Sequence, residues 1–140
     1  MGRARTREAR TLAAALAALL GSPVRAADEA RFVVRRRLLT ADTVGIFVPA
    51  VRYGGRPVLL LNATTSGRDR EALFALGVAH HYLNHRTLQA YSYARSGARY
   101  LDHLAEEEAR AFAVAFLRAM PSGRLALVRA YGSLVMSAGG

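Results

Sequence analysis

The spacing of apolar residues divides this chain into predicted strands and predicted helices. Short apolar runs bounded by Gly or Pro are typical of strands, and longer runs with apolar residues three and four apart are typical of helices. The predicted strands cover residues 32–39, 43–49 and 56–62. The predicted helices cover residues 1–22, 26–30, 69–88, 101–120 and 124–136, and residues 90–98 are predicted to be a loop or a broken segment.

This order of elements predicts one α+β domain spanning residues 1–140. An N-terminal helix precedes a three-stranded antiparallel-type meander, and a buried helix and a second long helix follow. The continuous apolar run at 58–61 suggests that the third strand is covered on both faces. Thr65 or Ser66 is placed to cap the helix that follows.

The predicted helix at 69–88 is apolar around most of its circumference but carries one polar wedge. At about 100° per residue, Gly77, His80, His81 and Asn84 fall within a wedge of roughly 100°, with His85 at its edge. A helix with so much apolar surface is normally buried, and buried imidazoles need hydrogen-bond partners or a metal. The wedge is therefore where we expect function.

Charge and composition change this picture little. The net charge is +10, which ordinarily indicates an anionic partner, and every basic residue is Arg. The arginines are spread along the chain apart from the run at 35–37, so nucleic acid is considered as a partner but is not favoured. There is no cysteine, which excludes disulfides and thiolate metal sites.

The N-terminal segment permits two interpretations. Its arginines precede an apolar run at 12–20 and small residues around Ala26, as in a signal peptide cleaved after Ala26. The same residues also fit an amphipathic helix that ends at Gly21, with Pro23 beyond it. We favour the helix, and with it a cytoplasmic location over a secreted one. No segment reaches the length of about 18 apolar residues that a membrane span needs.

The second half of the chain carries a series of short motifs in a recognisable order. A strand ends in Asn62, and the next helix holds the segment Gly77-Val78-Ala79-His80-His81-Tyr82-Leu83-Asn84-His85. The last long helix carries Glu106, then Ala109-Arg110-Ala111-Phe112-Ala113, and Met120-Pro121 follows. In order and spacing, residues 58–121 resemble the ImmA/IrrE family of zinc metallopeptidases. The resemblance implies a small zincin-like domain and a regulatory protein partner, such as a repressor.

The chain departs from that family at the residues on which the chemistry depends. A His-Glu-x-x-His motif holds zinc with two imidazoles one helical turn apart, and its Glu takes a proton from the bound water. In the register of the resemblance His81 is the second histidine, but Gly77 occupies the first-ligand position and Val78 the base position. The resemblance thus leaves His81 and Glu106 as metal ligands. We expect no catalytic residue, no zinc hydrolysis and no bound cofactor, with zinc as the alternative.

Helix geometry independently selects Glu106 as the inward carboxylate of its helix. At about 100° per residue, Glu106 lies roughly 50° from the centre of the apolar face, Glu108 roughly 110° and Glu107 roughly 150°. Asp102 lies one turn earlier on the same face. Glu106 is then either a remnant of a metal site or a flanking carboxylate paired with a neighbouring Arg.

Three functions follow from these alternatives. The leading one is a non-catalytic, pseudopeptidase-type domain that binds a protein, with its histidines held in a buried polar cluster by Glu106, Asp102 or backbone groups. The second is a metal-dependent peptidase with a relocated site of His81, His85 and Glu106, in which Tyr82 would occupy the base position. The third is a secreted basic binding module.

Overall fold

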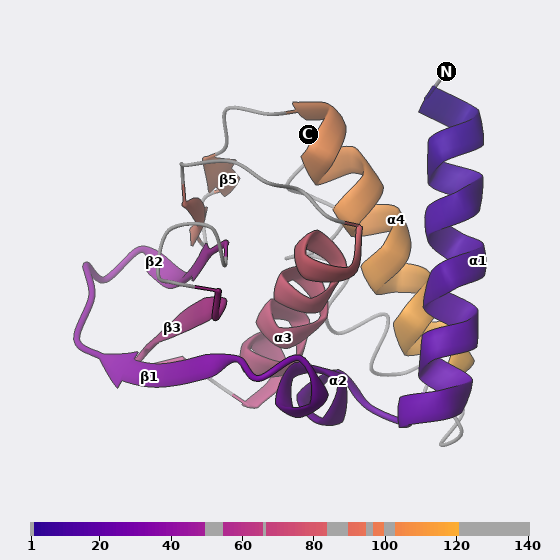
Figure 1. Ribbon diagram of the computed structural model, residues 1–140. Helices are drawn as coiled ribbons and strands as arrows, with labels where there is room; N and C mark the ends of the chain where they lie inside the picture. The colour runs from indigo at the N-terminus through magenta and orange to yellow at the C-terminus, as the bar shows by residue number, and fades with distance from the viewer. Residues whose placement is uncertain are drawn as a thin grey trace.

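The computed structural model describes residues 2–49, 55–65, 67–83, 90–94, 97–99 and 103–120. Its elements in chain order are α1 (Gly2–Leu20), α2 (Pro23–Glu29), β1 (Val33–Arg37), β2 (Thr43–Val48), β3 (Val58–Asn62), α3 (Gly67–Tyr82), β4 (Tyr91–Ala94), β5 (Gly97–Arg99) and α4 (His103–Ala119). The sheet lies on one side, α3 lies against it, and α4 and then α1 follow on the far side of α3 (Figure 1). The predicted α+β class is therefore confirmed.

The sheet is mixed, and its strand order is β1-β3-β2-β4-β5. β1 runs parallel to β3, and the other neighbouring pairs are antiparallel. The predicted meander of the first three strands is wrong, because β3 lies between β1 and β2. The side chain of Asn62 explains how the chain crosses the end of β3: its Nδ2 donates hydrogen bonds to the carbonyl oxygens of Thr40, at 3.1 Å, and Thr43, at 2.7 Å.

Two further strands lie where a loop or broken segment was predicted. β4 pairs with β2, and β5 forms the edge of the sheet beside β4. Along β4, Tyr91 and Tyr93 are buried while Ser92 between them is half-buried, as expected for a strand with one face on the core. The prediction for residues 90–98 is therefore wrong in the described part of that segment.

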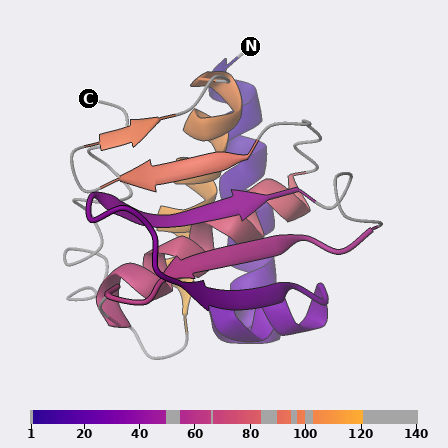
Figure 2. The same cartoon turned by 90° about the vertical axis from the view of Figure 1, so that its left-hand side faces the viewer.

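One face of the sheet packs on α3. The other face is turned toward the viewer in Figure 2, with the helices behind the sheet. On β3, Leu59 and Leu61 point into the core and are buried, whereas Val58 and Leu60 are half-buried. The prediction that this strand is covered on both faces is therefore wrong, because only its inner face is buried.

The first helix is an integral part of the packing. Ala9, Ala13 and Ala17 of α1 are completely buried, as are Ala109 and Ala113 of α4, which α1 contacts. Small side chains at these positions let two helices pack closely. The helix ends as the sequence predicts, because Gly21 has φ +85° and Pro23 begins α2.

α4 begins and ends within two residues of the predicted helix at 101–120, whereas α3 ends at Tyr82, six residues before the predicted end at residue 88. α3 begins two residues before the predicted start, and Thr65 does not cap it, since its hydroxyl donates to the carbonyl oxygen of Val44 at 2.7 Å. Ser66, residues 84–89 and the predicted helix at 124–136 lie outside the described residues. Among the helices of the described ranges, none combines the length and the apolar character needed to cross a membrane.

Candidate functional site

Gly77 and His80, two residues of the polar wedge, lie in the interior of the molecule on α3, and His81 is half-buried. Every residue from Ala72 to His80 is buried, because the sheet covers one side of this helix and α4 another (Figure 1). The prediction of a helix buried around its circumference is therefore confirmed. Asn84 and His85, the other residues of the wedge, lie outside the described residues.

His80 forms a compact hydrogen-bonded cluster with Tyr93 of β4 and Glu106 of α4. Its Nε2 atom lies 2.9 Å from the Tyr93 hydroxyl and 3.0 Å from Oε2 of Glu106. The Tyr93 hydroxyl donates to the same Oε2 atom at 3.0 Å. All three side chains are buried, and those of His80 and Glu106 have no exposed surface. The cluster thus joins α3, α4 and the sheet at one point.

Aromatic rings surround the imidazole of His80. The ring of Tyr91 stacks on it with a centroid separation of 3.7 Å, and the Phe47 ring lies nearly parallel to it at 5.8 Å. These rings exclude water from the cluster and lower the local dielectric constant, which strengthens its hydrogen bonds. They also fix the plane of the imidazole, so that Nε2 is directed at Glu106.

Tyr93 is held in its protonated form. Burial raises the pKa of its hydroxyl well above the ordinary value, and the neighbouring carboxylate of Glu106 raises this pKa further. The hydroxyl therefore remains a hydrogen-bond donor over the physiological pH range. Because a carboxylate oxygen can only accept, we assign the ring proton of His80 to Nε2, and both donors then converge on Oε2.

The second carboxylate oxygen of Glu106 is arranged differently. Oε1 is buried and accepts no hydrogen bond from any described residue. The guanidinium of Arg110 contacts the backbone rather than the carboxylate, since its Nε donates to the carbonyl oxygen of Glu106 at 3.4 Å. Glu106 is thus turned inward as predicted, while the alternative of a carboxylate paired with a neighbouring Arg is wrong among the described residues.

His81 lies outside this cluster. It is half-buried, and its ring and that of Phe32 form a T-shaped pair with a centroid separation of 5.7 Å. Burial lowers the pKa of His81 below its ordinary value, because the neutral imidazole is favoured where water is excluded. Its ring packs against the rings of Phe32 and Tyr82, so its role among the described residues is packing.

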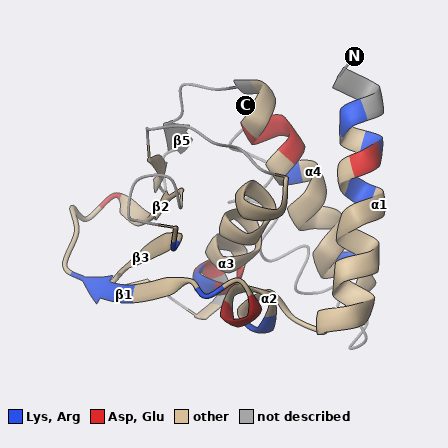
Figure 3. Ribbon diagram, viewed as in Figure 1, with Lys and Arg blue, Asp and Glu red and all other residues tan. Residues whose placement is uncertain are grey.

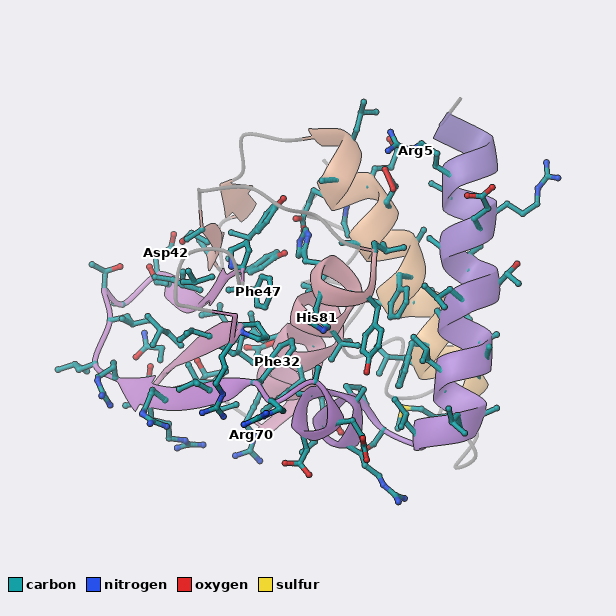
Figure 4. The ribbon with its side chains drawn as sticks, in the orientation of Figure 1. Arg5, Phe32, Asp42, Phe47, Arg70 and His81 are labelled. Atoms are coloured by element: carbon teal, nitrogen blue, oxygen red, sulfur yellow. The ribbon has the colours of Figure 1, made fainter. Side chains whose placement is uncertain are left out.

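Gly77 and Val78 occupy closely packed positions. A Cβ atom built on Gly77 would lie 3.1 Å from Cδ1 of Phe47 and 3.2 Å from Cε2 of Phe32, so aromatic rings fill the space where a side chain would begin. Figure 4 shows both phenylalanines between the sheet and α3, with His81 on the same helix. Val78 is completely buried. A side chain at position 77 would therefore require Phe32 and Phe47 to shift by a few tenths of an ångström, and Val78 is enclosed by the core.

The residues do not fit zinc in the way that the family resemblance implies. Glu106 is engaged by His80 and Tyr93, whereas His81 is directed at Phe32, so the described contacts do not bring His81 and Glu106 together. Within the described ranges, no group of three or more His, Asp or Glu side chains is arranged to hold a metal ion. His85 and Asp102 lie outside these ranges, so the relocated site of His81, His85 and Glu106 stays a prediction.

The two neighbours of Glu106 on α4 differ from each other. Glu107 is exposed, as predicted. Glu108 is buried although helix geometry turns it away from the apolar face, because α1 covers that side of α4 and Arg5 lies 3.6 Å from its carboxylate. The sequence pattern of one helix cannot show that a second helix covers its flank.

Sequence reasoning missed the residues that complete the cluster. Tyr93 and Tyr91 were placed in a loop, although the alternation Tyr91-Ser92-Tyr93 is a strand pattern that could have identified them. Phe32 and Phe47 were placed in strands, but nothing local indicates that they meet at Gly77.

Comparisons of this chain with protein-family models, with curated proteins and with solved structures found no match.

Proposed function

We propose that this chain is a non-catalytic, ImmA/IrrE-like domain of zincin-like fold that acts by binding a protein. The observation that carries the proposal is the packing at Gly77. The family's first metal ligand would stand there, and the rings of Phe32 and Phe47 lie 3.1–3.2 Å from the position of a Cβ atom. A site that had merely lost its ligand would leave space, whereas this one is filled by apolar side chains.

The state of Glu106 supports the same proposal. The family's Glu ligand would need a carboxylate oxygen directed at the metal, but Oε2 accepts hydrogen bonds from His80 and Tyr93. Removing those donors from a buried carboxylate costs about 1–3 kcal/mol each, so the closed cluster resists conversion into a metal site. In this proposal the former active-site residues stabilise the packing of α3 against α4 and the sheet.

The partner class comes from the family resemblance, which implies a regulatory protein such as a repressor. A cytoplasmic location belongs to the same proposal, because α1 buries three alanines against α4 and its removal as a signal peptide would expose them. The mass of the mature N-terminus measures this directly: a protein that begins at Ala27 would contradict it.

Metal content and peptidase activity test the proposal together. The purified full chain is incubated with one equivalent of zinc, desalted, and analysed for bound metal. It is then mixed with a candidate repressor, and cleavage is followed with and without a chelator. We expect no stoichiometric zinc and no cleavage, but retention of the repressor in a pull-down.

The variants His81→Ala and Glu106→Ala make the result interpretable. Zinc-dependent cleavage that either variant abolishes would overturn the proposal. Stoichiometric zinc that is lost in His81→Ala would revive the relocated metal site. Failure to retain any repressor would remove the protein-binding part and leave the non-catalytic part standing.

A further inference from the structure

β1 is an edge strand with one side of its backbone directed away from the sheet. The N–H of Val33 donates to the carbonyl oxygen of Pro57 at 2.8 Å, and the carbonyl oxygen of Arg37 accepts from the N–H of Ala63 at 2.8 Å. Successive residues of a strand direct their backbone groups to opposite sides. The backbone groups of Val34 and Arg36 therefore point outward, where no strand of the described ranges pairs with β1.

The side chains of this edge are cationic and have no acidic partner among the described residues. Arg35, Arg36 and Arg37 are all exposed, and Figure 3 shows the positive charge at the end of β1. No described carboxylate forms an ion pair with any of the three. Two of them instead cover their own edge: Nη1 of Arg35 donates to the carbonyl oxygen of Val34 at 3.0 Å, and Nη1 of Arg37 to that of Arg36 at 2.7 Å.

We propose that the β1 edge binds an extended acidic segment of a partner protein, which adds to the sheet as a further strand beside β1. Arg35 and Arg37 lie on the same face of the strand and about 7 Å apart along it, the spacing of alternate carboxylates in an extended peptide. The carboxylates of the bound segment form ion pairs with the two guanidinium groups. The carbonyl oxygens of Val34 and Arg36 are then free to accept hydrogen bonds from the backbone N–H groups of that segment.

The same edge fits a single-stranded nucleic acid less well. Such sites combine a cationic groove with exposed aromatic rings on which bases stack. The exposed large apolar side chains of the described residues are Leu12, Leu19, Val24, Leu38 and Leu104, and none is aromatic. The outward backbone groups of β1 are suited to a peptide strand, which supplies matching donors and acceptors.

This inference rests on the proposed function only for its class of partner, a protein, and it uses a surface separate from the His80 cluster. Arginines on an edge strand also serve to prevent unwanted strand pairing. The two roles differ in what they predict for an acidic peptide: a blocking edge leaves it unbound, and a docking edge pairs with it.

The test uses the full chain and a fluorescein-labelled ten-residue peptide that alternates Asp and Val, with binding followed by anisotropy at physiological salt. The matched probes are the Lys-Val peptide and a ten-nucleotide oligothymidine. We expect binding of the Asp-Val peptide alone.

The double variant Arg35→Glu/Arg37→Glu should weaken binding about tenfold or more, since two favourable charge pairs become repulsive. The control Arg10→Glu/Arg118→Glu reverses two exposed charges on α1 and α4, and should change binding less than about twofold.

A second pair of variants separates strand addition from attraction of charge. Arg36→Gln and Arg36→Pro lose the same charge, but only the proline also removes the outward N–H, a change that edge strands tolerate. We expect Arg36→Pro to bind at least about threefold more weakly than Arg36→Gln. Four outcomes would each overturn the proposal. Two concern the variants: equal binding by Arg36→Pro and Arg36→Gln, or an equal loss of binding in the control double variant. The other two concern the probes: tighter binding of the oligothymidine than of the Asp-Val peptide, or no peptide binding below about 1 mM. Zinc content and cleavage are independent readouts, so a failure here is distinguishable from a failure of the proposed function.

Discussion

The Nε2 atom of His80 lies 3.0 Å from Oε2 of Glu106, and neither side chain has any exposed surface. This contact joins α3 to α4 through the interior, and the hydroxyl of Tyr93 closes it from the sheet. Two donors converge on one carboxylate oxygen, so the stability of the whole arrangement depends on Glu106.

Replacing Glu106 should therefore destabilise the protein strongly. Glu106→Ala leaves two buried donors without their acceptor and should lower the free energy of unfolding by about 3–5 kcal/mol. Glu106→Gln keeps an oxygen that accepts both hydrogen bonds and should cost about 1–2 kcal/mol. Urea denaturation measures both. Glu107→Ala, on the exposed side of the same helix, is the control and should change stability by less than about 0.5 kcal/mol. Equal effects at the two positions would show that the cluster contributes nothing specific.

The sequence could predict that Glu106 points inward, but not which histidine meets it. The inward position follows from helical periodicity within α4 alone. His80 and His81 are adjacent in the wedge of α3, and the choice between them depends on how α3 is rotated against the sheet. That rotation is set where Phe32 and Phe47 contact Gly77, and it involves residues 30 or more positions apart in the sequence. Local patterns carry no information about such contacts.

The strand order shows the same limit. The residues of β1, β2 and β3 were recognisable as strands from their apolar runs, yet a meander and the observed order differ only in which strands pair. The deciding hydrogen bonds run from Asn62 to the backbone of Thr40 and Thr43, about twenty residues earlier. A single polar residue at the end of an apolar run indicates a strand end, but not the segment that it will bind.

Restoring a histidine at position 77 should damage the fold instead of rebuilding a metal site. Gly77→His pushes a side chain between Phe47 and Phe32, and overpacking of this kind costs about 1–3 kcal/mol. Phe32→Ala alone should cost about 3–5 kcal/mol. We expect the double variant to lose clearly less than the sum, because the imidazole then occupies the space that the phenyl ring leaves. Denaturation of the four proteins gives the coupling. Strict additivity would mean that Gly77 is not restricted by Phe32.

The packing of α1 on α4 can be tested with one substitution made at two neighbouring positions. Ala13→Leu places a large side chain at a completely buried position and should lower the free energy of unfolding by about 1–3 kcal/mol. Ala14→Leu makes the same change at an exposed position and should alter it by less than about 0.5 kcal/mol. Thermal or urea denaturation distinguishes them. Identical stabilities would indicate that α1 is not part of the folded domain and would support its interpretation as a signal peptide.

The partly buried His81 should make the stability of the protein depend on pH. Burial lowers its pKa in the folded state below the ordinary value of 6.5, so the unfolded chain binds the proton more readily. The free energy of unfolding therefore has its full value above about pH 6.5 and decreases as the pH falls through the lower pKa of the folded state.

His81→Asn removes this titration and keeps a polar side chain of similar size. Urea midpoints measured between about pH 7 and pH 5 should therefore fall less steeply for the variant than for the unaltered protein. The other histidines are present in both proteins and cancel in the comparison. Parallel curves would mean that the ring of Phe32 does not shield His81 from water.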